Sequence, residues 1–434
     1  MSLWTVLGFS GNPYDSRSLL ANAEGAELLV GRDLELRTLL SQLANSSLHP
    51  TLEGDNGVGK TSLVLVAAYN AMQARMEKKT YQAFAPVPTL LQIGTDSLQF
   101  ERQALMAIAQ ALIEHESYLR NCGHDVSSLS ELKRWLNEPI ISGGGGGIQI
   151  LGVGANAEIS NEANTSVGFS DSGFERVVID ALRTAFPTAE SGALIAVIDN
   201  MELLGRSNEA RRVLERIRDT SLSLPGVRWV LCGAKGIVRA SVSSPRLTGR
   251  IGRPLEIAPL KDDVIEPLIE ARLAYFAVRE DARAPVGPVE FRHLYDICNA
   301  NLRDALKYAQ EFCMWLDVQE ELERPQSEFL GLLEIWLAEE ASQITSSIKL
   351  QPRMWKLFDD LAAAGGTCAP GDFEAFGFSS PQRMRTNFAE LERADLISAE
   401  IDEDDLRRRT VSITSKGWLV NYSRSDFATA PTTP

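Results

Sequence analysis

The sequence has few of the residues on which disulfide-bonded and zinc-binding folds depend. Its 434 residues include five cysteines and four histidines, scattered without Cys-x-x-Cys spacing or a histidine cluster. This pattern argues against a disulfide framework and against a zinc site. The sequence also lacks a secretory signal and an apolar stretch of about 18 residues, so we expect a cytoplasmic protein without a membrane span. The 44% share of hydrophobic residues is enough for well-formed cores, and the length suggests two to four domains.

One motif carries most of the information in the sequence, the stretch GDNGVGKT from Gly54 to Thr61. It matches G-x-x-x-x-G-K-[ST] in full, a loop whose backbone N–H groups surround a polyphosphate while its lysine reaches the β- and γ-phosphates and its hydroxyl residue binds Mg²⁺. The apolar run that follows predicts a helix whose N-terminus faces the phosphates. The motif therefore predicts a site for ATP and Mg²⁺. Its expected ligands are Asn56, Gly57, Val58, Gly59, Lys60, Thr61 and Ser62.

A second strand-like run, from Ala193 to Ile198, ends in the acidic residue Asp199. The run has the length and composition of a buried strand in a parallel sheet. An aspartate at the carboxyl end of such a strand can lie beside the phosphate loop and help to hold the magnesium ion. We therefore expect Thr61 and Asp199 to form the metal site.

Together these motifs resemble those of the AAA+ ATPases, in the branch that contains the replication initiators (origin recognition) and the STAND signalling ATPases. The resemblance covers about residues 25 to 420. It implies an α/β fold with a P-loop parallel sheet core, followed by an α-helical lid and a winged helix-turn-helix domain. Upstream of the loop, residues 30 to 35 resemble the Gly-Arg-x-x-Glu box that lines the adenine pocket in this branch. By that resemblance Val30, Gly31 and Arg32 bind the nucleotide.

The chain departs from the family pattern directly after Asp199. Many related ATPases have a glutamate there that polarises the attacking water, whereas this chain has Asn200, with Glu202 two residues further on. Two alternatives remain open. Either Glu202 acts as the base while Asn200 orients the water, or the chain hydrolyses ATP slowly and works mainly as a nucleotide-dependent switch.

The resemblance also assigns roles to basic residues outside the two motifs. Lys235 follows a second buried-strand pattern, at the place of the family's sensor 1. Arg250 is the expected arginine finger, which would act on the nucleotide of a neighbouring subunit; Arg246 and Arg253 are alternates, and a solvated basic loop is the other interpretation. Arg303, in the stretch NANLRDALKYA, resembles the sensor 2 arginine and is expected to point at the γ-phosphate.

Five segments follow from the pattern along the chain. They are an N-terminal strap at 1–30, a nucleotide-binding core at 31–258, a helical lid at 259–345, a winged helix-turn-helix at 346–424 and a disordered tail at 425–434. Within the core, residues 140–172 contain five consecutive glycines and then alternating residues. We expect an insertion there, a flexible hinge that carries a β-hairpin. This insertion is either a tolerated surface excursion or a contact with a partner.

The C-terminal segment is the candidate for nucleic-acid binding. Three predicted helices and a hairpin resemble a winged helix, in which Arg383 and Arg385 of the third helix would enter the major groove and Arg407, Arg408 and Arg409 would contact phosphates. Residues 346 to 424 nevertheless contain 11 Lys and Arg against 12 Asp and Glu, a net charge of −1. This is no strong polyanion-binding surface. Contact with duplex DNA and contact with protein both remain open.

The sequence thus predicts an ATPase that works as a molecular switch. It would bind ATP and Mg²⁺, hydrolyse ATP slowly and couple its nucleotide state to the C-terminal winged helix in a DNA-linked process such as replication initiation, transposition or defence. The expected partners are further copies of the chain or another protein, and duplex DNA. The alternative is a nucleotide-gated oligomeric scaffold that does not hydrolyse ATP and acts through protein partners.

Overall fold

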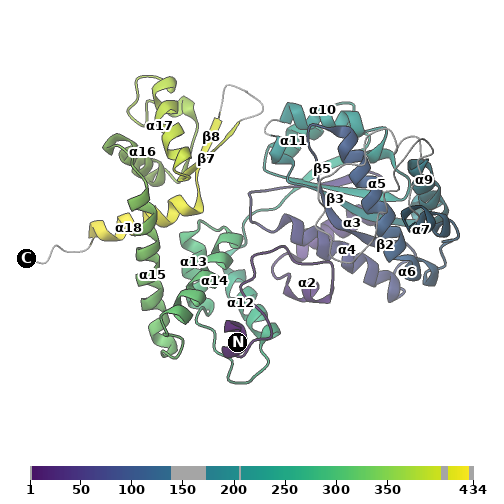
Figure 1. Cartoon of the computed structure of the whole chain (residues 1–434). Helices are drawn as coiled ribbons and strands as arrows, with labels where there is room; N and C mark the ends of the chain where they lie inside the picture. The colour runs from purple at the N-terminus through teal and green to yellow at the C-terminus, as the bar shows by residue number, and fades with distance from the viewer. Residues whose placement is uncertain (1, 138–172, 205–206, 402–408, 430–434) are drawn as a thin grey trace, which may run out of the picture.

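The computed structural model describes residues 2–137, 173–204, 207–401 and 409–429 (Figure 1). The expected insertion at 140–172 lies outside these ranges, and so do Arg407 and Arg408. Figure 1 shows the core on one side and the C-terminal segment on the other, with the helices of the lid region between and below them. None of the helices in the described ranges combines the length and apolar character needed to cross a membrane.

Five strands of the described core form one parallel sheet in the order β2-β3-β4-β1-β5. The strands are β1 (His49–Glu53), β2 (Ala83–Gln92), β3 (Gly192–Asp199), β4 (Val227–Gly233) and β5 (Ile251–Glu256). Every residue of β3 is buried, as expected of a parallel strand covered on both faces. The strand that leads into the phosphate loop, β1, lies between β4 and β5. The predicted α/β P-loop core is therefore confirmed.

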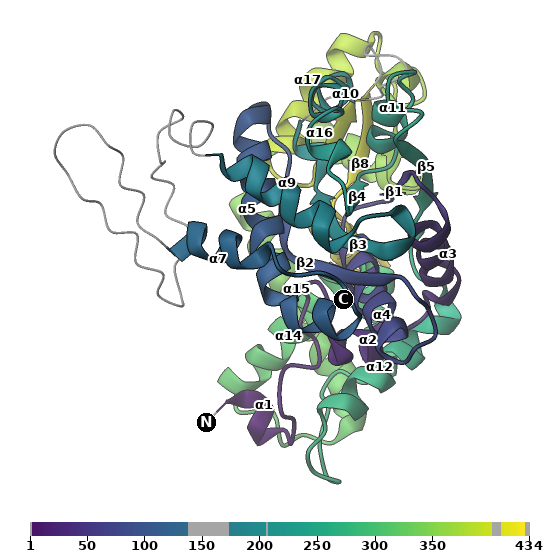
Figure 2. The ribbon, with the colours of Figure 1, turned by 90° about the vertical axis from the view of Figure 1, so that its right-hand side faces the viewer.

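Helices cover both faces of this sheet, and β3 shows how its side chains divide between them. Leu194, Ala196 and Ile198 point into one hydrophobic core, while Ala193 and Ile195 alternate into the other. The first core is closed by α5 (Ser97–Glu114), α6 (Glu116–Asn121), α7 (Leu129–Asn137), α9 (Phe174–Ala185), α10 (Ser207–Ile217) and α11 (Ile237–Val242). The second is closed by α3 (Asp33–Asn45) and α4 (Lys60–Met76). Figure 2 shows α5 and α9 on one side of the sheet and α3 on the other.

The lid region is helical, and it shares its core with the N-terminal segment. Its helices are α12 (Asp262–Phe276), α13 (Pro288–Ile297), α14 (Leu302–Val318) and α15 (Gln326–Ser347). The N-terminal segment contains α1 (Leu3–Val6) and α2 (Ala23–Leu28). Tyr14, between these two helices, is fully buried in the lid core. Phe9 also forms a β-bridge with Ala277. The strap therefore packs on the lid before it reaches the nucleotide-binding core.

The C-terminal segment folds around its own core of helices and a small antiparallel sheet. It contains α16 (Pro352–Ala363), α17 (Pro381–Arg393) and the strands β6 (Thr367–Cys368), β7 (Ile397–Ile401) and β8 (Arg409–Ile413), in the order β6-β8-β7. The chain between α16 and α17, where the second of the three predicted helices would lie, forms a 3-10 helix over Pro370–Asp372. The third predicted helix is α17, which begins after Ser380, whose side chain accepts a hydrogen bond from the Arg383 N–H.

The last helix, α18 (Ser415–Thr429), lies between the C-terminal sheet and the lid (Figure 1). It continues to Thr429, within the segment 425–434 that the sequence predicts as a disordered tail. Two successive side chains enter different cores: Leu419 is buried in the lid core and Val420 in the core of the C-terminal segment. Alternation of this kind lets one helix join two packed bodies. The lid and the C-terminal segment are therefore held together by packing as well as by the chain.

We expect truncation of these two neighbours to loosen different bodies. Leu419→Ala should destabilise the lid by about 2–5 kcal/mol, as is usual for a fully buried leucine, and Val420→Ala should destabilise the C-terminal segment by a smaller amount. Hydrogen exchange would check this: exchange should rise first in α13 and α15 for Leu419→Ala, and first in α16 and α17 for Val420→Ala. The same exchange pattern in both variants would show that the two cores are not separate.

Candidate nucleotide-binding site

The loop from Gly54 to Gly59 joins β1 to α4 and wraps back over the start of that helix. Gly57 and Gly59 have φ angles of 84° and 96°, a left-handed conformation that favours glycine. A Cβ atom on Gly57 would also lie 2.2 Å from the Asn301 Oδ1 atom. Gly57 is therefore required both by its backbone angle and by the close approach of the lid. This conformation gives the loop its expected phosphate-binding shape.

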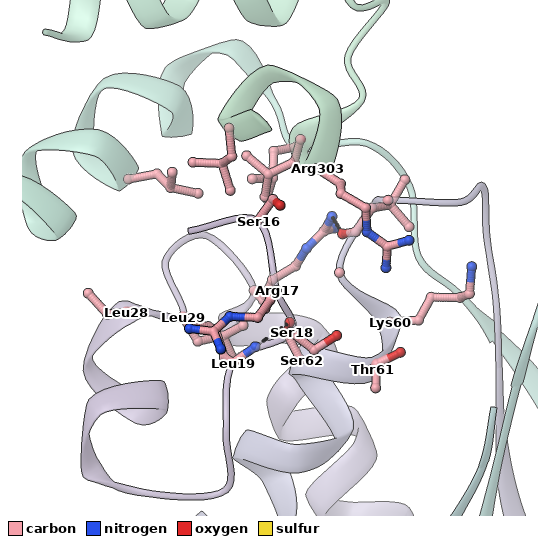
Figure 3. A pocket seen from close by; sticks show the side chains of 18 of the residues that line it. Ser16, Arg17, Ser18, Leu19, Leu28, Leu29, Lys60, Thr61, Ser62 and Arg303 are labelled. Carbon is pink, nitrogen blue, oxygen red and sulfur yellow. Dashed lines mark hydrogen bonds between the residues drawn. The ribbon is translucent and has the colours of Figure 1, made fainter. Parts of the chain in front are cut away.

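A cleft opens beside this loop, between the core and the lid (Figure 3). Figure 3 shows Leu28 and Leu29 toward one end and Lys60 and Thr61 toward the other. The cleft thus has an apolar end and a phosphate-binding end, as a nucleotide requires. Its lining residues come from the strap (Ser16 to Leu19), residues 28–30, Arg32, the loop (Asn56 to Ser62), Asp199, Asn200 and the lid (Leu260, Leu268, Arg272, Leu302, Arg303 and Leu306).

Lys60 lies at the phosphate-binding end, at the first position of α4. Its ammonium group donates to the backbone carbonyls of Gly54, at 2.8 Å, and Asp55, at 3.0 Å. Burial lowers the pKa of Lys60, while the nearby carboxylates of Glu202 and Asp199 act in the opposite direction. The lysine is therefore held over its own loop, where a phosphate oxygen would meet it.

Thr61 and Asp199 are brought together from positions 138 residues apart. The Thr61 hydroxyl donates to the Asp199 carboxylate over 2.8 Å, and both residues are only 7% exposed. The second oxygen of Asp199 accepts the N–H of Asn200 at 3.0 Å. A hydroxyl and a carboxylate side by side are the oxygen ligands that Mg²⁺ prefers. These two residues fit the metal that the sequence predicts.

Asn200 and Glu202 are placed differently from each other. Asn200 lines the cleft and has a φ angle of 55°, so the turn after β3 aims it inward. Glu202 is not among the lining residues, and its Oε2 atom accepts the backbone N–H of Ala234 at 3.0 Å. Glu202 thus links the carboxyl ends of β3 and β4 beside the cleft.

The three residues expected to bind the nucleotide around the Gly-Arg box, Val30, Gly31 and Arg32, occupy different positions. Val30 lines the cleft. Arg32 also lines the cleft; it is only 5% exposed and donates to the carbonyls of Val58, at 2.9 Å, and Ala258, at 2.7 Å, so it ties the phosphate loop to residue 258. Gly31 does not line the cleft: it has a φ angle of 77°, and a Cβ atom there would lie 2.1 Å from a methyl group of Val264. Because Gly31 has no side chain, Val264 of the lid helix α12 can pack closely against it.

Arg303 lies in the first turn of α14 and lines the cleft from the lid side (Figure 3). The residue that places it is Asn301, the N-cap, whose side-chain oxygen accepts the Asp304 N–H. The Asn301 amide also donates to the Asn56 carbonyl at 3.3 Å. The lid therefore touches the phosphate loop directly. Asn301 belongs to the stretch on which the prediction of Arg303 rested, but the sequence analysis gave it no role of its own, although an asparagine at the start of a helix is a common capping signal.

The other predicted basic residues lie away from this cleft. Arg250 precedes β5, and its carbonyl accepts the N–H of His49 at the start of β1. The phosphate loop follows the opposite end of β1, so Arg250 lies across the sheet from the chain's own loop. Arg246 pairs with Glu215 at 3.5 Å, and Lys235 pairs with Glu256 at 2.5 Å. Arg253 is exposed on the edge strand β5.

Two parts of the cleft lining were not indicated by any sequence motif. Residues Ser16 to Leu19 of the strap line it, and so does Arg272 of α12. The Arg272 guanidinium is almost fully buried and donates to the carbonyls of Pro13, at 2.8 Å, and Asp15, at 3.2 Å. Burial lowers the pKa of Arg272 to about 10. In the sequence Arg272 is the one basic residue of a helical stretch that also contains Glu266 and Glu270, and no motif marks it.

The predicted DNA-contacting residues are partly within the described chain. Arg383 and Arg385 are exposed on α17, whose Met384, Phe388 and Leu391 face the core. Arg409 begins β8, while Arg407 and Arg408 lie outside the described residues. In the part of the chain that the structure describes, no group of three or more His, Cys, Asp or Glu side chains is placed to hold a metal ion.

Three solved structures that are similar to this chain cover between 94% and 97% of it. The ORC1 protein of Aeropyrum pernix, in complex with DNA, has 14% identity and a TM-score of 0.47 and covers 94% of this chain and 96% of its own. A Walker-type ATPase of Pyrococcus abyssi has 15% identity and a TM-score of 0.46, with 94% and 99% covered. The ORC2 protein of Aeropyrum pernix, in its ADP form, has 13% identity and a TM-score of 0.45, with 97% and 100% covered.

No protein-family model matches the chain, and no curated protein is similar to it in sequence. Likenesses at these identities and TM-scores carry no argument about activity. The fold class therefore depends on the sheet order and on the phosphate loop themselves. The function has to be argued from the cleft.

A substitution at Gly31 tests the close approach of the lid to the core. Gly31→Ala should lower the free energy of unfolding by about 1–3 kcal/mol, because the new methyl group overlaps Val264 and the backbone angle disfavours a side chain. The midpoint of thermal unfolding measures this. Gly249→Ala is the matched control, since a Cβ atom at Gly249 would meet nothing within 4 Å. Equal unfolding midpoints for the two variants would contradict the packing argument.

Proposed function

We propose that this protein is an ATP-dependent molecular switch that binds ATP with Mg²⁺ between its core and its lid, hydrolyses it slowly and transmits its nucleotide state to the C-terminal segment. The observation that carries the proposal is the convergence of Lys60, Thr61, Asp199 and Arg303 on one cleft. These groups come from the phosphate loop, the end of β3 and the lid. Only a ligand that spans the cleft would contact all of them at once.

The chemistry of each group suits a bound triphosphate. The loop N–H groups and the N-terminus of α4 attract phosphate oxygens, and Lys60 adds a positive charge at the same end. Thr61 and Asp199 would hold Mg²⁺, which when bound neutralises charge on the β- and γ-phosphates. Arg303, which approaches from the lid, would complete the site on the γ-phosphate side.

Slow hydrolysis follows from the position of the acidic side chains. Asp199 is engaged with Thr61 and with the Asn200 N–H. Glu202 is engaged with the N–H of Ala234 and is set back from the cleft. A general base must come within hydrogen-bonding reach of its water. Glu202 would have to leave Ala234, or act through the amide of Asn200, before it could serve as the base.

A continuous series of contacts supports transmission to the C-terminal segment. Arg303 is followed by Asp304, whose Oδ2 atom accepts the Ser415 hydroxyl at 2.5 Å. Ser415 begins α18, the helix that is packed into both cores. A γ-phosphate that draws Arg303 toward the phosphate loop would therefore move α14 and α18 together. This is a population shift driven by contacts that differ between the two nucleotide states.

We also propose that the C-terminal segment is a winged helix that contacts duplex DNA in a process such as replication initiation, transposition or defence. Its support is the exposure of Arg383 and Arg385 on the outer face of α17, next to a small antiparallel sheet.

The position of Arg250 favours a second copy of the chain as a further partner. Arg250 lies before the first residue of β5, at the end of the core sheet opposite the chain's own phosphate loop. The second candidate function is a scaffold that binds ATP without hydrolysing it, and the engaged state of Glu202 favours it.

Steady-state ATPase measurements with and without duplex DNA test the enzymatic part. Turnover should be slow, should be lost in Lys60→Ala and should rise with DNA. Glu202→Gln and Glu202→Ala separate two roles of that residue. The glutamine can still accept the Ala234 N–H but cannot take a proton, so loss of turnover by about 100-fold in both variants identifies a base. Loss in Glu202→Ala alone would identify a structural tie between β3 and β4.

Nucleotide binding without any phosphate release, with or without DNA, would contradict the enzymatic proposal and support the scaffold. Unchanged affinity for ATP in Lys60→Ala would contradict the site itself, because that lysine is the main positive charge at the phosphate-binding end. Isothermal titration with ATP separates these results from a defect in folding.

The link through Ser415 makes a separate prediction. Ser415→Ala should reduce the change in hydrogen exchange of α16 and α17 that ATP produces, because it removes the hydrogen bond to Asp304. The affinity for ATP should stay within about threefold, since neither Ser415 nor Asp304 lines the cleft. Thr414, which accepts the Gly417 N–H, still caps α18 in this variant. Ser346→Ala is the matched control, because its hydroxyl bonds only within α15. An equal ATP-induced change in the hydrogen exchange of α16 and α17 in both variants would contradict the proposed link.

A further inference from the structure

A second pocket lies at the end of the core sheet opposite the phosphate loop. It has a volume of about 300 Å³, at the lower end of the range for small-molecule sites. The first residues of β1, β3 and β4 line it, with His49 on β1 and Arg228 on β4. The five residues of β1 separate it from the phosphate loop, a distance of about 15 Å. A ligand in this pocket would therefore occupy a site apart from the nucleotide-binding cleft.

The charged side chains in the lining of this pocket are positive. They are Arg228 and Arg250, and among the described residues that line the pocket there is no aspartate or glutamate. Residues 207 to 256 contain 10 Lys and Arg against 4 Asp and Glu, a net charge of +6, in a protein with a net charge of −15. The pKa of nearby Asp219 is lowered by Arg218, to which it is bonded at 2.8 Å, and also by Arg250. The pocket is thus a positive site in an acidic protein, which attracts anions.

Arg228 is partly buried, and the chain leaves its guanidinium short of acceptors. Its Nη1 atom donates to the Ser47 carbonyl at 3.1 Å. Its Nε atom is buried and has no hydrogen-bond partner among the described residues. Burial lowers the pKa of Arg228, and no described carboxylate acts in the opposite direction. Because a buried charge without a counter-charge is costly, an anion bound here would stabilise the site.

His49 forms the inner wall of the pocket as a neutral ring. Its Nδ1 atom accepts the backbone N–H of Trp229 at 3.2 Å, so this nitrogen carries no proton, and its Nε2 atom donates to the Leu222 carbonyl at 2.8 Å. Burial lowers the pKa of His49 to about 4, and the charges of Arg228 and Arg250 act in the same direction. Both guanidinium groups therefore lie close enough to the ring to influence it.

Two guanidinium groups at one pocket match an oxyanion with two negative charges. Their N–H donors pair with phosphate oxygens in a forked arrangement, and a phosphate group carries roughly two negative charges near neutral pH. The lining also includes Pro187, Leu224 and Pro225. These residues give the pocket an apolar surface on which a small organic group attached to the phosphate could pack.

We propose that this pocket binds a phosphate group, either free or as part of a small phosphomonoester, and that Arg228 contacts it from the inner wall while Arg250 contacts it from the rim. The site goes beyond the proposed function, because the pocket shares no lining residue with the nucleotide-binding cleft.

Nuclear magnetic resonance of the full chain with ¹³C-labelled histidine tests the proposal. His49 lies in the wall of the pocket, and His293 of α13 serves as a reference in the lid. Inorganic phosphate, added near neutral pH at constant ionic strength, should shift the ring signal of His49 until it saturates and leave that of His293 unchanged. Ribose 5-phosphate is the second probe. Tighter binding of ribose 5-phosphate would identify an ester as the preferred ligand, and tighter binding of inorganic phosphate would identify the free ion.

Substitution of Arg228 shows whether the binding depends on the proposed contact. Arg228→Met should weaken the binding of inorganic phosphate by about tenfold or more, because it removes charge-assisted hydrogen bonds. Arg253→Met is the matched control, since Arg253 is an exposed arginine of β5 that does not line the pocket. If Arg228→Met does not fold, Arg250→Met removes an exposed side chain without emptying a core, and it should weaken binding in the same way.

Three results would overturn the proposal. The first is a His49 signal in the wild type that neither probe shifts to saturation. The second is an equal loss of affinity in Arg228→Met and Arg253→Met, which would indicate a general effect of positive charge. The third is a shift that requires ATP and vanishes when the protein is diluted to the monomer, which would identify the anion as the nucleotide of a second copy. The first two results leave ATP binding in the cleft unaffected, so they are distinguishable from a failure of the proposed function.

Discussion

The lid is hydrogen-bonded to the phosphate-binding loop by Asn301, whose amide donates to the Asn56 carbonyl over 3.3 Å. The approach is possible because Gly57 has no side chain, since a Cβ atom there would lie 2.2 Å from the same asparagine. Asn301 also begins the helix that carries Arg303 and Asp304. The cleft, the placement of the lid arginine and the contact with Ser415 all depend on this junction. A side chain at position 57 would therefore disturb more than the loop that contains it.

The parts of the site that the sequence predicted are those whose chemistry is local. The phosphate loop needs its glycines, lysine and threonine in one stretch, and Asp199 ends a strand whose apolar pattern is plain. Their meeting over 2.8 Å follows from the rule that parallel strands end at one edge of the sheet. Gly31 shows the limit of such reasoning. Its pattern indicated a nucleotide contact, whereas its closest constraint is Val264, more than two hundred residues away in the chain.

The parts that the sequence did not predict depend on contacts between distant segments. Arg272 lies in a helix that also contains Glu266 and Glu270, so its charge does not stand out in the sequence, and its role is set by the carbonyls of Pro13 and Asp15. Helix α18 was not among the predicted elements, and Leu419 and Val420 make it part of two cores. Periodicity reports which face of a helix is buried, but not which body buries it.

The strap also acts as a tether of finite length. On the lid side it is anchored up to Asp15, whose carbonyl accepts a hydrogen bond from Arg272, and on the core side it is anchored from Leu19, whose N–H donates to the Ser62 hydroxyl. Four residue steps of fully extended chain span about 14 Å at most. While both anchors hold, the lid can withdraw from the core only until this short segment is taut, and any wider opening requires one anchor to break. The amplitude of lid motion is therefore bounded by the number of residues between the two anchors, so inserting residues there would widen the opening without altering any group in the cleft.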